Sequence, residues 1–404
     1  MACSNGIERA SLLEHTMKVA IIDPLGGHGG HHYYVDGIAT GLQKAGMEIT
    51  VYTVGETAIR GNEPYRIEVV FRGLYGSDPA LLRGLRYVRG LFRSVFLAWH
   101  QKCRIVHLHF FLGDLREYLA VLVARAAGMR VVATVHDVEN FGRPRMTVGL
   151  QRVARHCSAL IVHNSFSRDR LMQASRTRDI HTLVTVIPHG HYFHNYPDMP
   201  DRWTARARLG LPADKTIFLF FGNPREEKGL DLLLRAMGHL RDSKTAMLLV
   251  AGKMKAELAA QCRTIIEEEG IGAITRLDVG HVSDRDLPFY FSAADLVVAP
   301  YRRIYESGVA LMAMSFGRAV LASNLPPLTE LTDNGTLGLL FTSNNTADLA
   351  RALQEAIDKR PILDALGERA KARVLAERGW DAIGRQTAAL YNRVCPWNEK
   401  GQRT

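Results

Sequence analysis

The sequence predicts an α/β protein that consists of two doubly wound domains in tandem. Short runs of valine, isoleucine, leucine and phenylalanine recur along the chain and alternate with stretches whose apolar residues repeat at helical spacing. Such continuous apolar runs are typical of parallel strands that are buried on both faces. The series stops after Tyr196, at a segment rich in proline and aspartate, and then starts again. A chain of 404 residues is long enough for two domains of ordinary size.

The first domain is expected over residues 17–196. A strand over Val19–Ile22 is followed by a glycine-rich turn, a helix that ends near Gly46, and a second strand, ITVYTV. This order makes a βαβ unit. Further strands are expected at 104–111, 129–137, 158–165 and 184–190. Residues 1–16 have no apolar stretch long enough for a secretory signal and are expected to form a disordered tail.

The second domain is expected over residues 214–377, after an interdomain linker at 197–213. Its strands are expected at 216–222, 246–252, 276–280, 296–300 and 319–323. Its helices are expected to begin near Gly229 and at Ser307, and to cover 255–270, 345–360 and 361–377. A final helix at 378–395 has no strand after it, and 396–404 is expected to be a second tail.

Composition excludes several classes of protein. The chain is 47% apolar and 23% charged, values typical of globular proteins and not of disordered or fibrous ones. No apolar run reaches the roughly 18 residues of a membrane-spanning helix. Five scattered cysteines without a C-x-x-C motif favour a reducing compartment. The expected location is therefore the cytoplasm, either free or at the inner face of the membrane.

A glycine-rich loop lies between the first strand and the first helix and consists of Gly26, Gly27, His28, Gly29 and Gly30. Backbone amides and the helix dipole favour an anion at such a position, and glycine lets a ligand approach the backbone closely. The loop does not fit the dinucleotide-binding pattern G-x-G-x-x-G, because His32 stands at the third glycine position. It is not a Walker loop either, because no Gly-Lys-Ser/Thr follows. Ligand binding and a tight turn alone are both open interpretations.

A second motif, FGNPREEKG, places Arg225 and Lys228 between a strand and a helix. Cations at the carboxyl edge of a parallel sheet are suited to bind a diphosphate. The alternative is a solvated turn in which Glu226 and Glu227 neutralise both cations.

A third motif follows the strand at 296–300. Its loop carries Arg302, Arg303 and Glu306, and a helix begins at Ser307 and Gly308. Amides at a helix start can hold phosphate oxygens, while a glutamate can accept hydrogen bonds from sugar hydroxyls.

Histidines are concentrated in the first half of the chain, where fourteen of the sixteen precede residue 200, many of them at strand ends. A metal site is one interpretation. However, no pair has the helical spacing of a zinc motif with a glutamate between its members, and His107 and His109 share one strand face without a third partner in sequence. Polar or buried neutral histidines are therefore favoured over metal ligands, and no metal is expected.

The segment 79–113 contains six basic residues and no acidic one, with apolar residues at near-helical spacing. A basic amphipathic helix can lie on an anionic membrane surface, so residues 79–104 are a candidate for peripheral membrane contact. The alternative is an ordinary surface helix whose apolar stripe faces the core. Nucleic acid is not expected as a partner, because stacking aromatics on a known module are absent.

In this order and spacing the three motifs resemble the GT-B glycosyltransferases, and among them the large family of nucleotide-sugar enzymes called family four. The resemblance covers about residues 17–395 and includes TVHD at Thr134–Asp137, VIPHG at Val186–Gly190, GHVSDRDLPFYFSAADLVVAPY and SGVALMAMSFGRAV. It implies two Rossmann-like domains that face a central cleft, an N-terminal domain for the acceptor and a C-terminal domain for the nucleotide sugar. The final helix resembles the one that crosses back to the N-terminal domain in such proteins.

The resemblance also implies a role for individual residues. Arg225 and Lys228 would bind the donor diphosphate and stabilise it as the leaving group. Glu306 would bind the donor sugar, and His136 would lie near the reacting sugar carbon. The expected donor-binding residues are Gly26, Gly27, Asn223, Arg225, Lys228, Ser307, Gly308 and Val309. The expected acceptor-side residues are His28, His31, His109 and His189.

The sequence departs from the family pattern at two places. The family usually has two glutamates eight residues apart, and those positions hold Ile304 and Met312. Glu306 can replace the first glutamate, but the second has no acidic substitute. Asn223 also stands where many relatives have arginine.

The sequence therefore predicts a metal-independent hexosyltransferase without a cofactor. It would move a sugar from a nucleoside-diphosphate sugar to a hydroxyl of a glycan or lipid-linked glycan, in polysaccharide or glycolipid synthesis. Two alternatives remain open at this point: an epimerase or hydrolase of the same fold, and a noncatalytic binder of nucleotide sugars.

Overall fold

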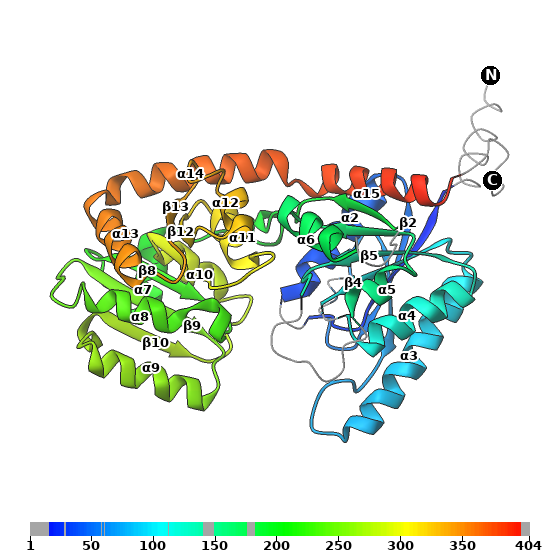
Figure 1. The fold of residues 1–404 in the computed structure, drawn as a ribbon, viewed down its shortest axis with the longest axis horizontal. Helices are drawn as coiled ribbons and strands as arrows, with labels where there is room; N and C mark the ends of the chain where they lie inside the picture. The colour runs from blue at the N-terminus through cyan, green and yellow to red at the C-terminus, as the bar shows by residue number, and fades with distance from the viewer. Residues whose placement is uncertain are drawn as a thin grey trace. The chain divides into compact units, whose positions relative to one another are not determined.

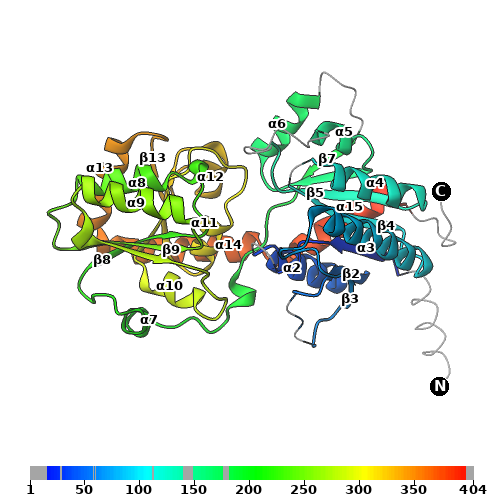
Figure 2. The same ribbon diagram turned by 90° about the horizontal axis from the view of Figure 1, so that it is seen from below.

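The computed structural model describes residues 16–27, 30–57, 59, 61–111, 113–139, 149–175 and 182–396. These residues form two parallel sheets with helices packed on them (Figures 1 and 2). The chain divides into two compact units. Unit 1 comprises Met1–Gly190 and Arg378–Thr404, and unit 2 comprises His191–Glu377. The α/β fold class with two doubly wound domains is confirmed.

The sheet of unit 1 has seven parallel strands. In spatial order they are β3 (Arg66–Phe71), β2 (Glu48–Val54), β1 (Lys18–Asp23), β4 (Ile105–Phe110), β5 (Arg130–Val135), β6 (Ala159–Val162) and β7 (Leu183–Val186). The order reverses beside β1, and in doubly wound sheets ligands bind outside the carboxyl ends of the strands at such a point.

The helices described in unit 1 are α2 (His31–Lys44), α3 (Ala80–His100), α4 (Leu115–Ala126), α5 (Leu150–Ala154), α6 (Ser165–Ser175) and α15 (Trp380–Val394). In Figure 1, α2 and α15 lie above the strands of this sheet, and α3 and α4 lie below them. Trp380 joins the core of unit 1, where its ring contacts that of Tyr34 edge-on. The last helix of the chain is therefore part of the N-terminal unit.

The sheet of unit 2 has six parallel strands. In spatial order they are β10 (Thr275–Val279), β9 (Ala246–Gly252), β8 (Thr216–Phe221), β11 (Leu296–Ala299), β12 (Ala319–Ser323) and β13 (Leu339–Phe341). Its helices are α7 (Arg202–Leu209), α8 (Leu230–Gly238), α9 (Ala256–Glu268), α10 (Leu287–Ala293), α11 (Gly308–Ser315), α12 (Pro326–Leu331), α13 (Thr346–Asp358) and α14 (Arg360–Glu377). The order reverses beside β8, so the carboxyl ends of β8 and β11 meet at the switch point.

Part of the expected linker is folded within unit 2. Residues of α7 pack on α10, and the Arg206 guanidinium is buried against the Asp295 carboxylate at 2.6 Å. Both side chains also bond to backbone: Arg206 donates to the carbonyl of Ala293, and Asp295 accepts from the amide of Ile217. A buried ion pair of this kind is stable only when its remaining polar atoms are satisfied, as they largely are here.

Two strands escape the sequence pattern, β3 and β13. Both are edge strands, and β3 is only half-buried along most of its length. β13 has three residues, too few for any periodicity to be recognised. Their place in the sheets follows from pairing with β2 and β12 and not from their own composition.

Among the described helices, none is both long enough and apolar enough to span a bilayer.

Candidate functional site

The first part of the candidate site is the loop after β8 in unit 2. Arg225 is exposed, and Lys228 ends a short 3-10 turn, η4 (Glu226–Lys228), just before α8. Within the described part of the chain, neither side chain makes an ion pair or a hydrogen bond. The Lys228 ammonium lies 5.4 Å from the centre of the Tyr301 ring, an attractive cation–π contact. The glutamates beside the two cations therefore do not neutralise them by pairing.

The loop after β8 is held against the loop after β11. The Arg302 guanidinium donates to both carboxylate oxygens of Asp231, at 2.7 and 2.6 Å, and to the carbonyl of Glu226 at 3.0 Å. The backbone amide of Arg302 donates to the carbonyl of Glu227 at 2.8 Å. Gly229 has φ of 61° and leaves no room for a Cβ, which would overlap the carbonyl of Pro300. Arg302 thus fixes the segment that carries Arg225 and Lys228.

The start of α11 forms the second part of the site. Ser307 caps this helix, since its Oγ accepts from the amide of Ala310 at 3.1 Å. The preceding amides of the helix have no partner within it, because the first turn of any helix lacks acceptors. A Cβ built on Gly222 would lie 3.6 Å from Lys228 Nζ and 3.7 Å from Val309 Cγ2. The two expected donor-binding elements therefore meet beside Gly222.

Tyr192 is a site residue that sequence reasoning missed. Its hydroxyl lies next to Gly308, where a Cβ would come within 2.8 Å of it. Burial, together with the nearby charge of Glu306, raises the pKa of the Tyr192 phenol well above its usual value. Tyr192 lies close to Glu306 and Gly308 because the start of unit 2 folds back onto α11. The backbone amide of Tyr192 also donates a hydrogen bond to the hydroxyl of Ser315 in α11, at 3.2 Å.

The positions that depart from the family pattern carry no carboxylate in the structure either. Met312 is buried in α11, Ile304 is half-buried in the loop before it, and Asn223 is exposed after β8. Glu306 is half-buried two residues after Ile304.

A separate candidate site in unit 1 is a cluster of six histidines among the residues that the structure describes. Their side chains gather at the carboxyl edge of the seven-stranded sheet, from the start of α2 and from the ends of β4, β5, β6 and β7. The histidine cluster consists of His31, His107, His109, His136, His163 and His189. The expected residues His31, His109, His136 and His189 are thus brought together, and His107 and His163 join them. His28 lies outside the described residues.

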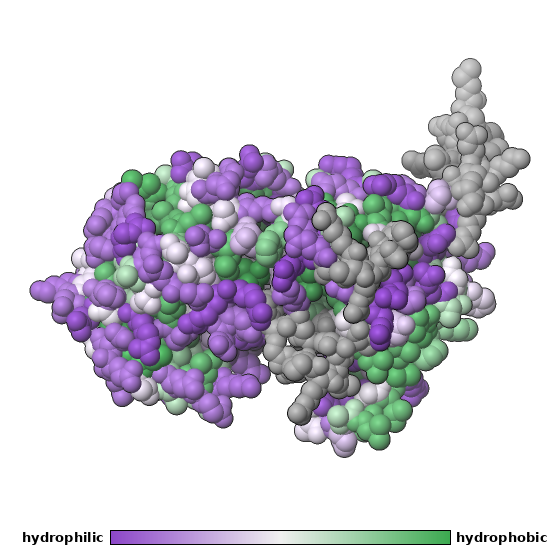
Figure 3. Space-filling model, in the orientation of Figure 1, coloured by the Kyte–Doolittle hydropathy of each residue, from purple (hydrophilic) through white to green (hydrophobic). Residues whose placement is uncertain are grey.

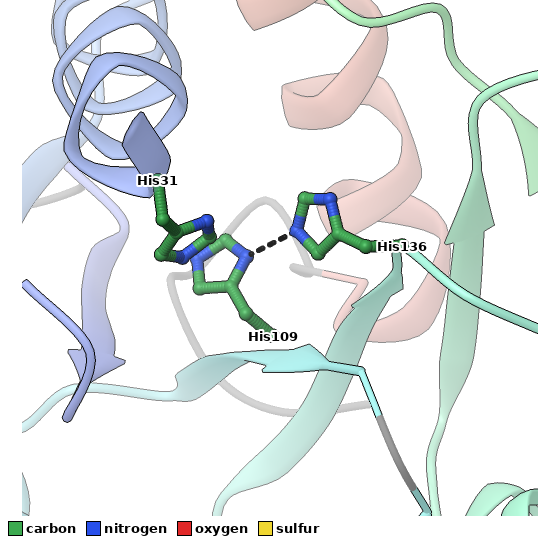
Figure 4. Close-up of side chains that lie close together, drawn as sticks. All are labelled: His31, His109 and His136. Carbon is green, nitrogen blue, oxygen red and sulfur yellow. Dashed lines mark hydrogen bonds between the residues drawn. The ribbon is translucent and has the colours of Figure 1, made fainter. Parts of the chain in front are cut away.

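Three of these histidines point toward one another (Figure 4). The ring centres of His31 and His109 are 4.6 Å apart, and those of His31 and His136 are 5.1 Å apart, both in edge-to-face geometry. His136 Nε2 lies 3.4 Å from His109 Nδ1, and Phe111 stacks on the other face of His136 at 4.5 Å. His109 therefore has partners from other elements, which its own strand could not supply.

The remaining rings of the cluster are held by hydrogen bonds within unit 1. His107 bonds through both nitrogens, to the Tyr391 hydroxyl at 2.6 Å and to the Thr134 hydroxyl at 2.8 Å. His163 Nδ1 donates to the carbonyl of Ile187 at 3.0 Å. The bond between His107 and Tyr391 ties the final helix, α15, to the end of the sheet that carries the cluster.

Burial lowers the pKa of the clustered histidines. Together with nearby charged groups, chiefly His31 for His107 and Arg378 for His163, it lowers the pKa of His107 to about 3 and that of His163 to about 4. The pKa values of His109, His136 and His189 also lie well below the usual value, for the same reasons. The rings are therefore neutral at pH 7 and keep a nitrogen lone pair.

The described glycines of the N-terminal loop have a packing role. A Cβ on Gly26 would overlap the side chains of Val54 and Thr57, and one on Gly27 would lie 3.1 Å from the carbonyl of Glu56. The Asp23 carboxylate accepts hydrogen bonds from the amides of Leu25 and Gly26. The glycines let the loop lie close to the segment that follows β2, whatever ligand it also meets.

Comparison with known proteins identifies two family models along the chain. Residues 28–192 match the model described as Glycosyltransferase Family 4, and residues 201–373 match that of Glycosyl transferases group 1. The D-inositol 3-phosphate glycosyltransferase of Kineococcus radiotolerans is 26% identical over 435 residues, which cover 98% of this chain and 97% of that protein. The enzyme of the same name from Saccharomonospora viridis is 28% identical over 380 residues, with 87% and 85% covered.

Solved structures share the fold. Sucrose-phosphate synthase from Thermosynechococcus elongatus superposes with a TM-score of 0.73 at 21% identity, covering 94% of this chain and 99% of that one. HepE of Anabaena in complex with UDP-glucose gives a TM-score of 0.74 at 19% identity, with 93% and 100% covered. With two consecutive family models, relatives aligned over nearly its whole length and this shared architecture, the chain belongs to the GT-B glycosyltransferases of group 1 and family 4.

Proposed function

We propose that this glycosyltransferase moves a hexose from a nucleoside-diphosphate sugar to a hydroxyl group of a glycan or lipid-linked glycan, in polysaccharide or glycolipid synthesis. The observation that carries the donor half is the pair of cations after β8. Arg225 and Lys228 stand at the switch point of a parallel sheet without an ion pair to any described residue. A diphosphate is the anion that a fork-shaped guanidinium and a compact ammonium bind well together.

The bond that breaks joins the anomeric carbon of the sugar to the diphosphate oxygen. Negative charge grows on the diphosphate as this bond lengthens, and Arg225 and Lys228 stabilise that charge in the transition state. The amides of Ser307 and Gly308 at the start of α11 hold the distal phosphate. Two cations and a helix dipole supply the positive charge, so the donor half of the proposal needs no metal ion.

The sugar and the acceptor are assigned to the remaining site residues. Glu306 accepts hydrogen bonds from the donor sugar, while His136 lies beside the reacting carbon. Because burial keeps its pKa well below the usual value, the His136 ring is neutral at pH 7 and can accept a hydrogen bond from a hydroxyl. His31, His109 and His189 stand on the acceptor side in this proposal, as does His28.

The donor half is tested with a panel of UDP, GDP, ADP and TDP and their common sugars. UDP-sugars come first, because HepE, a structural neighbour, has been crystallised with UDP and UDP-glucose. A bound donor is expected to raise the melting temperature by mass action. Product analysis with the donor alone then separates transfer from epimerisation or hydrolysis. Donor binding without nucleotide release in the presence of any acceptor contradicts the proposed transfer.

Arg302→Ala is expected to lower kcat/KM for the donor by about tenfold to a hundredfold without unfolding the chain. The cause is positional, because Arg302 touches the loop of Arg225 and Lys228, and a small displacement of binding groups is costly in rate. Asp231→Asn should have a smaller effect in the same direction, and the double variant should be less than additive. Arg302→Lys is not expected to restore activity, since it keeps the charge but loses the fork. An unchanged kcat/KM in Arg302→Ala contradicts the positioning role.

The acceptor half of the proposal places α3 on an anionic membrane. Six large apolar side chains of this helix are exposed: Leu81, Leu82, Leu85, Phe92, Phe96 and Trp99. At about 100° per residue, positions 81, 85, 92, 96 and 99 lie within about 60° of one another around the helix. The face that packs on the domain lies beside the stripe: its buried residues Val95, Leu91 and Ala98 are about 70°, 110° and 130° from the middle of the stripe. The exposed stripe is therefore not the face that the core needs.

The surroundings of the stripe suit an anionic lipid. Arg89 and Arg93 are exposed beside it. A groove of about 510 Å³ lies between α3 and α4 and is lined by Phe92, Val95, Phe96, Trp99, Leu122, Val123, Ala126 and Ala127. Figure 3 shows the apolar surface over α3. Apolar side chains that enter the acyl region and arginines that meet headgroups would hold the enzyme where a lipid-linked acceptor lies.

We expect the chain to bind vesicles that contain an anionic lipid and not vesicles of a zwitterionic lipid alone, at low salt. Phe92→Ser combined with Phe96→Ser should weaken binding by at least about tenfold. Both side chains are exposed to water in the free protein, so their apolar surface is buried only when the protein binds the membrane. Leu122→Ser, which changes one exposed residue of α4 at the rim of the groove, is the single-site variant with which the double variant is compared. Co-sedimentation measures the affinity. Equal binding of wild type and double variant, or no binding by wild type, contradicts the membrane assignment.

A further inference from the structure

The histidine cluster contains a set of three rings with the geometry of a metal site. His31, His109 and His136 each offer a ring nitrogen, and these three atoms lie within 4.8 Å of one another. One pair of ring nitrogens within the set, His136 Nε2 and His109 Nδ1, is 3.4 Å apart. Two ligands of a tetrahedral zinc ion with bonds of about 2.0–2.1 Å are separated by about that distance.

Hydrogen bonding does not account for all of these ring nitrogens. His31 Nε2 and His109 Nε2 are both buried, and neither has a hydrogen-bond partner among the described residues. The side chains of His31 and His109 are more than nine-tenths buried. His107, two residues before His109, contrasts with them because both of its nitrogens are bonded. A buried polar atom without a partner costs free energy, and coordination of a metal ion by His31 Nε2 would remove that cost there. His109 would bind the ion through Nδ1, the nitrogen that faces His136.

A negative charge lies beside the three rings. The carboxylate of Asp23 is buried, and its Oδ1 lies 3.6 Å from His31 Nε2. Its oxygens already accept from the amides of Leu25 and Gly26, so it is held in place. A carboxylate near ligating histidines orients the rings and balances the charge of the metal, a common arrangement around zinc.

We propose that His31, His109 and His136 bind a divalent transition-metal ion of the zinc class, with its fourth coordination position open. Neutral imidazoles are ligands that zinc prefers, and calcium or magnesium would require oxygen ligands that these rings do not offer. All three ligands belong to unit 1, and the proposed function assigns the same rings to the acceptor side and the reacting carbon. A bound zinc ion and an acceptor hydroxyl would therefore compete for the single lone pair of the neutral His136 ring.

The first experiment measures zinc binding by the full chain without a histidine tag, after removal of metal with EDTA. Isothermal titration is expected to give one equivalent of zinc per chain. Co²⁺ in the same site is expected to show the visible absorption of a tetrahedral ion. His31→Ala and His109→Ala should each lower the affinity by more than the tenfold to hundredfold typical of second-shell changes. His281→Ala, at an exposed histidine of unit 2, is the matched control and should bind zinc as wild type does.

A second measurement avoids variants that fail to fold. X-ray absorption of the zinc-loaded wild type should show three imidazole ligands and one light atom. Absence of a saturable equivalent, unchanged affinity in both variants, or fewer than three imidazoles overturns the proposal. All of these readouts are independent of sugar transfer, so the outcome does not depend on whether the proposed function is correct.

Discussion

Arg225→Ala is expected to lower kcat/KM for sugar transfer by about 10²–10³-fold, the usual cost of removing one group that stabilises transition-state charge. Its side chain is exposed and makes no ion pair or hydrogen bond with a described residue. The loss of its side chain should therefore leave the stability of unit 2 nearly unchanged. The measurement is steady-state transfer with the donor that the binding panel identifies, together with the melting temperature of the variant.

Two variants make this result specific. Arg225→Lys keeps the charge but not the planar fork and should fall between wild type and Arg225→Ala. Arg241→Ala removes one exposed arginine from the same unit, away from the loop, and should transfer as wild type does. The donor-induced rise in melting temperature should also disappear in Arg225→Ala. Wild-type turnover in that variant removes the diphosphate assignment, whereas equal losses in Arg241→Ala indicate a general effect of net charge.

Acid is expected to destabilise unit 1 well above the pH at which carboxylates protonate. The pKa of His107 is lowered to about 3 and that of His163 to about 4 in the folded chain, chiefly by burial. In the unfolded chain both return to about 6.5. Between these values the unfolded state binds more protons than the folded state, so the free energy of unfolding falls as the pH falls. The slope is about 1.4 kcal/mol per pH unit for each such histidine.

The charged neighbours of the cluster act in opposite directions. Arg378 lowers the pKa values of His163 and His189, whereas Asp23 opposes the lowering at His31. Burial outweighs Asp23, because the pKa of His31 is still below its usual value. Protonation of the cluster is therefore unfavourable in the folded state as a whole.

Urea unfolding from pH 6.5 to about 5, in the presence of EDTA, measures this effect before Asp and Glu titrate. His163→Asn should reduce the slope by the share of one histidine, while His281→Asn, at an exposed position, should leave it unchanged. Fluorescence and circular dichroism should be compared, because two units need not unfold together. A wild-type slope near zero in this window shows that the cluster is not held neutral.

The sequence predicted the central strands of both sheets and the edge strands β7 and β10, but not the edge strands β3 and β13. β1, β4, β8 and β11 are short apolar runs buried on both faces, and local composition is enough to identify such runs. β3 and β13 become strands because a neighbouring strand pairs with them. Pairing between edges depends on the assembled sheet, and composition within the strand does not encode it.

The candidate site divides in the same way. The sequence by itself determined which residues stand at strand ends, and hence Arg225, Lys228, His109 and His136, because parallel strands expose their carboxyl ends at one edge. It could not reveal that Arg302 locks the loop of the two cations, or that Tyr192 lies beside Gly308.

The tertiary structure alone decided which histidines meet. His31 comes from the start of α2, His109 from β4 and His136 from the end of β5, and sheet order places β4 beside both β1 and β5. Spacing along the chain gave no metal pattern, because the three histidines proposed as ligands belong to three elements and have no common period. Local patterns record how each segment folds, whereas the contacts between segments arise only when the sheet is assembled.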